Sequence, residues 1–253
     1  EVFYKPSELE TGMLRTGVSD ERILEVIKDS DAIGLTSIFS HQETMVLRTA
    51  RLIKKHFPEK FIFSGGVNAR NRTNKFFQAG VDLICMSEAE KTIIDIAKTL
   101  RKNSRNFSHI PQVMFMKNGH EASTGNRMIT RKGKPATDII WDLDELPMPA
   151  WDLLPNERYW EIRRPHGGHF EQDEDLKYIS MMTSLGCPFR CSYCHISRET
   201  LGSTAGQIGS YRIKSDERVL EEMQTLKDLG VKQVFIEDDS LLGIKKRAIR
   251  LIE

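Results

Sequence analysis

The sequence predicts an α/β protein with two units, each built around parallel β-strands. Short apolar runs alternate with stretches of helical period in both halves of the 253-residue chain, and a proline-punctuated segment separates the halves. Strands that alternate with helices indicate parallel sheets with helices packed on their faces. We expect a first unit over residues 1–105, a connector over 106–175 and a second unit over 176–253.

The first unit is expected to hold an open parallel sheet with helices on both faces. Apolar runs bounded by small residues predict buried strands, and helical spacing predicts the segments between them. The strands are expected at 31–37, 61–66 and 81–86, and the helices at 42–56, 74–79 and 89–100. Cys85 lies within the third apolar run, so we interpret it as a small buried residue of the strand.

Ligands of open parallel sheets bind at the carboxyl ends of the strands. Those ends are Thr36-Ser37, Gly65-Gly66 and Ser87-Glu88-Ala89-Glu90. The pattern predicts a crevice there of a size suited to a nucleotide or a cofactor. A glycine pair lets a flat ligand approach the backbone, and a simple turn explains it equally well.

The connector contains one predicted hairpin and one extended stretch. Residues 112–116 read as a strand that runs into an Asn118-Gly119 turn. Prolines in 141–155 predict a largely extended backbone whose Trp and Leu side chains dock onto the neighbouring units. His166 and His169, in a glycine-containing loop, are interpreted as exposed rather than as a metal pair.

The second unit has the pattern of the first βαβ of a parallel barrel, a fold whose active sites lie at the carboxyl ends of the strands. The predicted order is a strand at 177–184, a cysteine-bearing loop, a helix at 216–229, a strand at 231–236, an acidic turn and a helix that begins near Gly243. Ser215 is a good N-cap and Gly230 a good C′ residue for the first of these helices.

Three cysteines within eight residues are the strongest functional signal in the chain: Cys187, Cys191 and Cys194. Thiolates are the usual ligands of iron–sulfur clusters, which normally take four cysteines. Three cysteines would leave one iron open to a substrate or cofactor. A zinc site that adds His195 is an alternative, although structural zinc sites usually combine two separated ligand pairs. A site without metal is a second alternative.

Composition excludes several broad classes. The chain has 37 basic and 36 acidic residues, so its formal net charge of +1 gives no sign of a general nucleic-acid binder. We find no run of about 20 apolar residues that would span a membrane, and no signal-peptide core. The chain begins with Glu1 and stops inside an expected helix, so we expect an internal fragment of a longer protein.

The spacing C-x3-C-x2-C, with Tyr193 before the last cysteine, resembles the cluster motif of radical S-adenosylmethionine (SAM) enzymes. The resemblance implies a partial (β/α)6 barrel of the TIM type, truncated here, with a [4Fe-4S] cluster on the three cysteines and SAM on the open iron. It also implies residues that contact SAM, namely Phe189, Tyr193, Glu237, Asp238 and Asp239. The last three stand where the family often has Gly-Gly-Glu, and a solvated acidic turn is the alternative reading.

The first unit, followed by the cysteine motif, resembles the Rossmann-like (flavodoxin-like) cobalamin-binding domain of cobalamin-dependent radical SAM enzymes. The segment Leu-Asp-Glu-Leu-Pro-Met-Pro-Ala-Trp-Asp at 143–152 strengthens the resemblance. It implies that cobalamin contacts Thr36, Ser37, Gly65, Gly66 and Glu88. Ser87 departs from the Gly-Glu-x-Glu of the family, and the Asp-x-His-x-x-Gly motif is absent, so the domain lacks its first strand. His41 is interpreted as a loop residue exposed to solvent.

The resemblance implies reductive cleavage of SAM and methyl transfer to an unactivated carbon of a small-molecule substrate. A flavodoxin or ferredoxin would donate the electron, and a cytoplasmic location suits an oxygen-labile cluster without disulfides. One alternative is cobalamin-dependent radical oxidation or cyclisation, as in the oxygen-independent Mg-protoporphyrin ester cyclases. A non-enzymatic alternative is a cofactor-binding sensor with a structural metal site.

Overall fold

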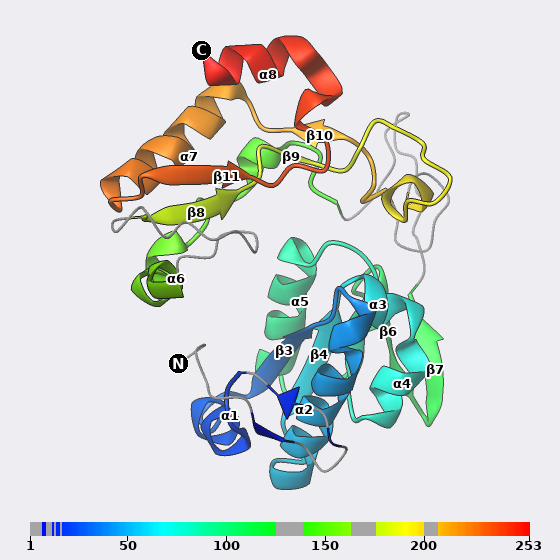
Figure 1. The fold of residues 1–253 in the computed structure, drawn as a ribbon. Helices are drawn as coiled ribbons and strands as arrows, with labels where there is room; N and C mark the ends of the chain where they lie inside the picture. Colours follow the sequence, from blue (N-terminus) through cyan, green and yellow to red (C-terminus); the bar gives the residue numbers. More distant parts are fainter. Residues whose placement is uncertain are drawn as a thin grey trace. The chain divides into compact units, whose positions relative to one another are not determined.

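A computed structural model describes residues 7–8, 12, 14–15, 17–124, 139–162, 176–199 and 207–253. Its contacts divide the chain into two compact units, one of residues 1–139 with 201–207 and one of residues 140–200 with 208–253. Figure 1 shows both units, and each is described by itself below. The loop that contains His166 and His169 lies outside the described residues.

A five-stranded sheet forms the centre of the first unit, in the order β3-β4-β5-β6-β7. Parallel pairing joins the first three, which are β3 (Ala32–Thr36), β4 (Phe61–Gly65) and β5 (Leu83–Cys85). Antiparallel pairing adds β6 (Val113–Lys117) and β7 (His120–Ser123). The sheet is therefore mixed rather than purely parallel.

The β6–β7 hairpin corrects our assignment of residues 113–123 to the connector. Asn118 and Gly119 both have positive φ values, 52° and 79°, as a two-residue hairpin turn requires. The turn itself was predicted. What the sequence did not show is that Leu83, Ile84 and Cys85 of β5 pair with Phe115, Met114 and Val113, which extends the first sheet.

Helices cover both faces of this sheet, as predicted. One face packs against α2 (Glu43–His56), α3 (Val67–Asn71) and α4 (Thr73–Gln78), and the other against α5 (Glu90–Arg101) (Figure 1). Side chains of β4 alternate between the two cores, with Ile62 in the first and Phe61 in the second. Cys85 is buried in the second core, and burial raises its thiol pKa to about 12, which confirms its apolar role.

A short N-terminal segment precedes the sheet. It comprises β1 (Ser7–Glu8), β2 (Leu14–Arg15) and α1 (Asp20–Val26). Arg48 of α2 donates two hydrogen bonds of 2.6 and 2.7 Å to the Asp20 carboxylate. Together with Arg15, it lowers the pKa of Asp20 to about 2, so this ion pair ties α1 to α2 at neutral pH.

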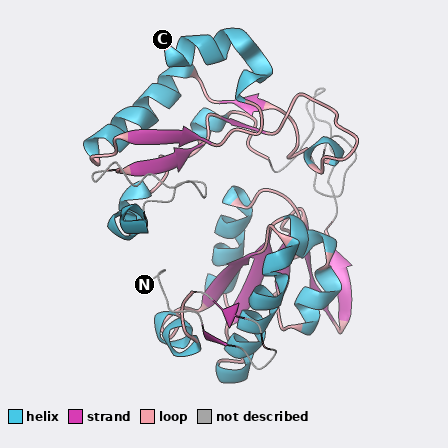
Figure 2. Cartoon of the chain, viewed as in Figure 1, coloured by secondary structure: helices cyan, strands magenta, loops and turns pink. Residues whose placement is uncertain are grey.

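The second unit contains a parallel strand pair, shown as neighbouring arrows in Figure 2. β8 (Tyr178–Met181) pairs in parallel with β11 (Gln233–Ile236), and α7 (Asp216–Asp228) lies between them in the chain. After β11 come η6 (Leu241–Ile244) and α8 (Lys245–Ile252), as predicted. Buried side chains of β8, α7 and the connector form its core, including Ile179, Met181, Val219, Leu226 and Trp151.

The strand predicted over 177–184 is broken in the structure. β8 ends at Met181, and β9 (Ser184–Leu185) pairs instead with β10 (Arg212–Ile213) in antiparallel fashion. The cause is Asp238, whose Oδ1 accepts hydrogen bonds from the backbone amides of Thr183 and Ser184 at 2.6 and 3.1 Å. A carboxylate thus takes the amides that a continuing parallel ladder would use.

The connector is less extended than its prolines predict. Two single 3-10 turns, η2 (Leu143–Glu145) and η3 (Trp151–Leu153), interrupt it, and α6 (Asn156–Ile162) follows. Leu143 and Trp151 are buried, whereas Leu153 is 79% exposed. Asp144 accepts a 3.0 Å hydrogen bond from the amide of Ser215, so the connector contacts the start of α7.

The two ends of α7 are capped as the sequence predicts. Ser215 Oγ accepts a 3.0 Å hydrogen bond from the amide of Arg218. Gly230 has a φ of 81°, the left-handed conformation that glycine adopts without strain after a helix. These caps fix the length of the helix that links β10 to β11.

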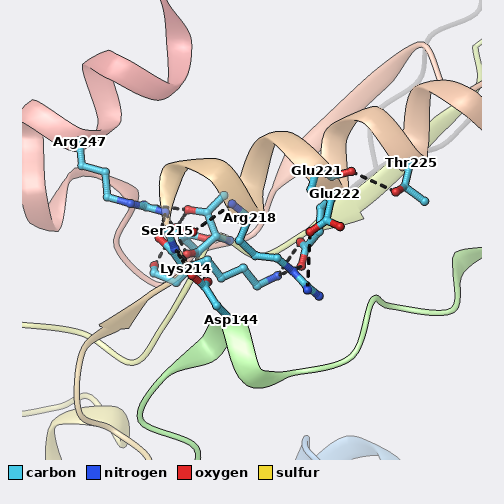
Figure 3. Close-up of polar contacts among 11 residues, drawn as sticks. Asp144, Lys214, Ser215, Arg218, Glu221, Glu222, Thr225 and Arg247 are labelled. Atoms are coloured by element: carbon cyan, nitrogen blue, oxygen red, sulfur yellow. Dashed lines mark hydrogen bonds and ion pairs between the residues drawn. The ribbon is translucent and has the colours of Figure 1, made fainter.

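A buried ionic group supports α7, as Figure 3 shows. Glu222 is fully buried, and both of its carboxylate oxygens accept hydrogen bonds from Lys214 Nζ, at 2.8 and 2.6 Å. Arg218 Nε donates a further 2.9 Å bond to Oε1. Because Lys214 directly follows β10, this group joins α7 to the strand that pairs with β9.

Removal of this carboxylate is expected to be strongly destabilising. Glu222→Ala leaves the buried ammonium of Lys214 without its anion, so the free energy of unfolding should fall by about 3 to 5 kcal/mol. The neighbouring Glu221→Ala, on an exposed side chain, is the control and should change it by less than about 0.5 kcal/mol. Urea unfolding of both variants measures the difference, and similar losses would contradict the buried role of Glu222.

Candidate active site

The cysteine loop leaves β9 and is held by its own backbone and by Gly209. The amide of Cys187 donates to the carbonyl of Gly209 at 3.2 Å, and the amide of Cys194 donates to the carbonyl of Cys191 at 3.2 Å. Ser197 Oγ donates to the carbonyls of Cys191 and Cys194, at 2.7 and 2.8 Å. The backbone at all three cysteines is therefore anchored.

Gly186 allows the loop to pass close to the chain before β10. It has a φ of 74°, and a Cβ at this position would collide with the carbonyl oxygen of Ser210. Only glycine satisfies both the positive φ and the close approach without strain. The residue just before the first cysteine is thus fixed by backbone packing.

The three thiols are accessible to different degrees. Cys187 and Cys194 are partly buried, and Cys191 is exposed. Within the part of the chain that the structure describes, no three His, Cys, Asp or Glu side chains are gathered closely enough to hold a metal ion.

Asp238 connects the ends of the two parallel strands. Besides the two amide bonds, its Oδ2 accepts hydrogen bonds from the hydroxyls of Thr183, at 2.6 Å, and Ser184, at 2.7 Å. Thr183 and Ser184 are both buried. Four donors therefore converge on the Asp238 carboxylate, and the two residues that supply them shortly precede Cys187 in the chain.

The neighbouring acidic residues have different surroundings. Glu237 Oε1 accepts a 2.8 Å hydrogen bond from Ser180 Oγ on β8. Partial burial raises the pKa of Asp239, while the nearby His195 ring and Gly186 amide act in the opposite direction and the Asp238 carboxylate adds to the rise. Asp239 thus has electrostatic neighbours in the cysteine loop and just before it.

The raised pKa of Asp239 has a defined sign for stability. A carboxyl group whose folded pKa exceeds its unfolded value binds protons more tightly in the folded state. Its contribution to stability is present below the unfolded pKa, near 3.8, and is lost as the pH rises through the folded pKa. Folding therefore disfavours the ionised form of Asp239.

The aromatic residues expected near SAM lie on the surface of the loop. Phe189 is 58% exposed and Tyr193 is 90% exposed. Pro188 packs close to Gly243 beside Tyr211, whose hydroxyl donates to the carbonyl of Ser240 at 3.2 Å. These contacts bring the cysteine loop next to the turn that follows the acidic residues.

In the first unit, the structure brings Ser37 together with the glycine pair. The amide of Ser37 donates to the carbonyl of Gly65 at 2.9 Å, and its buried hydroxyl accepts a 2.9 Å bond from Asn68 Nδ2. Gly66 has a φ of 99°, and a Cβ there would lie 2.5 Å from the carbonyl oxygen of Ser37. The expected glycine turn is thus also a point of close backbone approach.

Other residues at the carboxyl ends of these strands differ in their exposure. Thr36 is exposed at the end of β3, and Glu88 is partly buried after β5. Ser87 Oγ is buried and has no hydrogen-bond partner among the described residues. An unsatisfied buried hydroxyl carries a desolvation penalty of about 1 to 3 kcal/mol, so it is suited to a ligand that supplies the missing partner.

A cavity of about 530 Å³ lies at the opposite edge of the same sheet. Its lining includes Asp31 and Lys60, just before β3 and β4, and Arg101 and Arg105, at and after the end of α5. The buried ammonium of Lys60 already donates to the carbonyls of Lys28 and Ser30, at 2.8 and 2.6 Å. This cavity does not coincide with the predicted crevice.

One protein-family model matches a segment that lies mostly in the second unit. Residues 181–246 match the model of the Radical SAM superfamily, a range that includes the three cysteines and the three acidic residues. This segment of the chain is therefore similar to radical SAM proteins. No helix among the described residues is both long and apolar enough to cross a membrane.

Individual proteins are similar to this chain over most of its length. The chain is 28% identical over 233 residues to an uncharacterized methyltransferase of Pyrococcus horikoshii, covering 90% of this chain and 44% of the relative. It is 24% identical over 207 residues to the cobalamin-dependent radical SAM methyltransferase TokK of Streptomyces tokunonensis, covering 81% and 27%. These matches support the family that the sequence resembles, and the chain spans less than half of either relative.

A solved structure has a similar fold. The cobalamin-dependent SAM radical enzyme OxsB, determined with aqua-cobalamin and SAM bound, matches with a TM-score of 0.64 and 20% identity. The match covers 88% of this chain and 28% of OxsB. It shows that this chain has a similar fold over most of its length.

Several residues of the site were not found from the sequence. The sequence indicated Thr183 and Ser184 only weakly, because they are two hydroxyl residues at the end of a predicted strand. It contained no indication of Arg247, Ser197 or the Ser87 hydroxyl. Their roles depend on distant partners in the chain or on burial, and the Ser87 hydroxyl has no partner among the described residues.

Proposed function

We propose that this chain is part of a cobalamin-dependent radical SAM methyltransferase that acts on a small molecule. The observation that carries the proposal is the anchored three-cysteine loop that follows β8 and β9, inside the matched superfamily segment. The donor set fits a [4Fe-4S] cluster, because three thiolates leave one iron for a further ligand. Cys187, Cys191 and Cys194 would hold it.

The acidic turn supports a SAM site beside the cluster. When bound to a reduced cluster, SAM supplies an oxidising carbon radical. Asp239 is the carboxylate best placed to accept hydrogen bonds from its ammonium group, since Gly186 and His195 of the cysteine loop are its electrostatic neighbours. Phe189 and Tyr193 offer exposed aromatic faces for the adenine.

The carboxyl edge of the first sheet supports a cobalamin site. Gly66 lets the turn after β4 lie close to the Ser37 backbone, Thr36 is exposed and Glu88 is partly buried. Ser87 offers a buried hydroxyl that has no hydrogen-bond partner among the described residues. The buried Ser37 would act by holding the Gly65-Gly66 turn in place. Cobalamin supplies a methyl group to a carbon centre, which is consistent with methyltransferase relatives.

The cluster and SAM cleavage are tested together in the full-length protein. Anaerobic reconstitution with iron and sulfide, followed by dithionite and SAM, should yield 5′-deoxyadenosine. Cys191→Ala should reduce this product to background, because it removes a cluster ligand. Cys85→Ala, at the buried cysteine of the other unit, should leave it unchanged. A protein that retains zinc, takes up no iron and forms no 5′-deoxyadenosine would exclude the proposal.

The cobalamin site is tested at Ser87. Ser87→Ala removes an unpaired buried hydroxyl, so the cofactor-free protein should gain up to about 1 kcal/mol in free energy of unfolding. Its affinity for cobalamin should fall several-fold, because the ligand loses a hydrogen bond. Urea unfolding and a cobalamin titration followed by absorbance measure the two effects.

Ser108→Ala, at an exposed serine of the same unit, is the control and should change neither quantity. An unchanged cobalamin affinity in Ser87→Ala, together with the gain in stability, would place this hydroxyl outside the cofactor site.

A further inference from the structure

A polar chain of three residues links three elements of the second unit: Arg247 on α8, Thr183 between β8 and β9, and Asp238 after β11. Arg247 Nη1 donates to Thr183 Oγ1 at 3.1 Å, and the same hydroxyl donates to Asp238 Oδ2 at 2.6 Å. Arg247 and Thr183 are only 1% and 0% exposed. Arg247 is among the residues shown in Figure 3.

Further hydrogen bonds hold Thr183 in its position. Arg247 Nη2 donates to the carbonyls of Thr183 and Lys214, each at 3.1 Å. The amide of Lys214 donates to the carbonyl of Thr183 at 3.0 Å. The Thr183 hydroxyl is therefore both acceptor and donor between a cation and an anion, which strengthens both of its hydrogen bonds.

The Asp238 carboxylate uses its hydrogen-bonding capacity within the protein. Its two oxygens accept bonds from two amides and two hydroxyls of Thr183 and Ser184. A carboxylate has about four lone-pair sites, so these donors leave little capacity for a ligand. The adjacent Asp239 has the Gly186 amide and the His195 ring near it instead.

We propose that Thr183 and Arg247 are positioning residues for SAM. They hold Asp238 at the strand ends, which leaves Asp239 near the cysteine loop, and they fix the strand end that leads into Cys187. The inference rests on the proposed function. It assigns different roles to two adjacent aspartates and a role in cofactor binding to residues that contact no cofactor.

The test compares two substitutions at Thr183 in the full-length, cluster-loaded protein. Thr183→Val keeps the size of the side chain and removes the hydroxyl, whereas Thr183→Ser keeps the hydroxyl. Thr225→Val is the matched control, because it removes a hydroxyl of α7 that bonds only the Glu221 carbonyl. Iron and sulfide content reports the cluster. The SAM-dependent change in the electron paramagnetic resonance spectrum of the reduced cluster reports SAM binding.

Thr183→Val is expected to keep wild-type iron content while the SAM concentration for half of the spectral change rises about tenfold or more. Thr183→Ser and Thr225→Val should titrate like the wild type. If Thr183→Val does not fold, Arg247→Lys takes its place, since it keeps the charge and loses the forked contacts. The same rise in the required SAM concentration is then expected.

A wild-type titration in Thr183→Val, or in Arg247→Lys, would overturn the inference. So would a Thr183→Ser variant as defective as Thr183→Val, because the hydroxyl would then not be the cause. Failure of the proposed function looks different, because the wild-type cluster itself would then show no spectral change with SAM.

Discussion

The hydrogen bonds between Asp238 and the residues Thr183 and Ser184 are the interaction on which the second unit depends. They end β8, start β9 and tie the end of β11 to the segment that leads into the cysteine loop. A parallel strand pair alone would not turn the chain at this point. The position of Cys187 is therefore set by a carboxylate more than fifty residues further along the chain.

Buried charge is balanced around this interaction. Arg247 reaches Asp238 through the Thr183 hydroxyl and lies 3.6 Å from Asp216 at the start of α7. Lys214 and Arg218 in turn both donate hydrogen bonds to the Glu222 carboxylate. Buried ion pairs of this kind contribute little net stability, and the loss of one partner is costly. Their value here is that they define one geometry for the strand ends.

Much of the fold could be predicted from local pattern. The strand at 61–66, the helix at 42–56 and the caps at Ser215 and Gly230 all depend on residues close in sequence, and the structure has them. Long-range choices could not be predicted. The hairpin at 113–123 joins the first sheet through pairing with β5, and the break after Met181 depends on Asp238. In both cases the pairing partner lies too far along the chain to be found from the local sequence.

The candidate site likewise has some features that the sequence shows and others that only the structure shows. The cysteine spacing was evident from the sequence, whereas the differing surroundings of Asp238 and Asp239 required the structure, because adjacent residues of one type look identical in a motif. Ser87 provides a second case. Its departure from glycine was visible, but the absence of a partner for its hydroxyl among the described residues was not.

The central claim is that the three-cysteine loop carries an iron–sulfur cluster with one iron left for SAM. Mössbauer spectroscopy of the full-length protein reconstituted with ⁵⁷Fe tests it most directly, with spectra recorded before and after SAM is added. We expect the spectrum of a four-iron cluster in which SAM alters the signal of a single iron. A cluster spectrum that SAM leaves unchanged, or a protein that binds zinc in place of iron, would contradict the account.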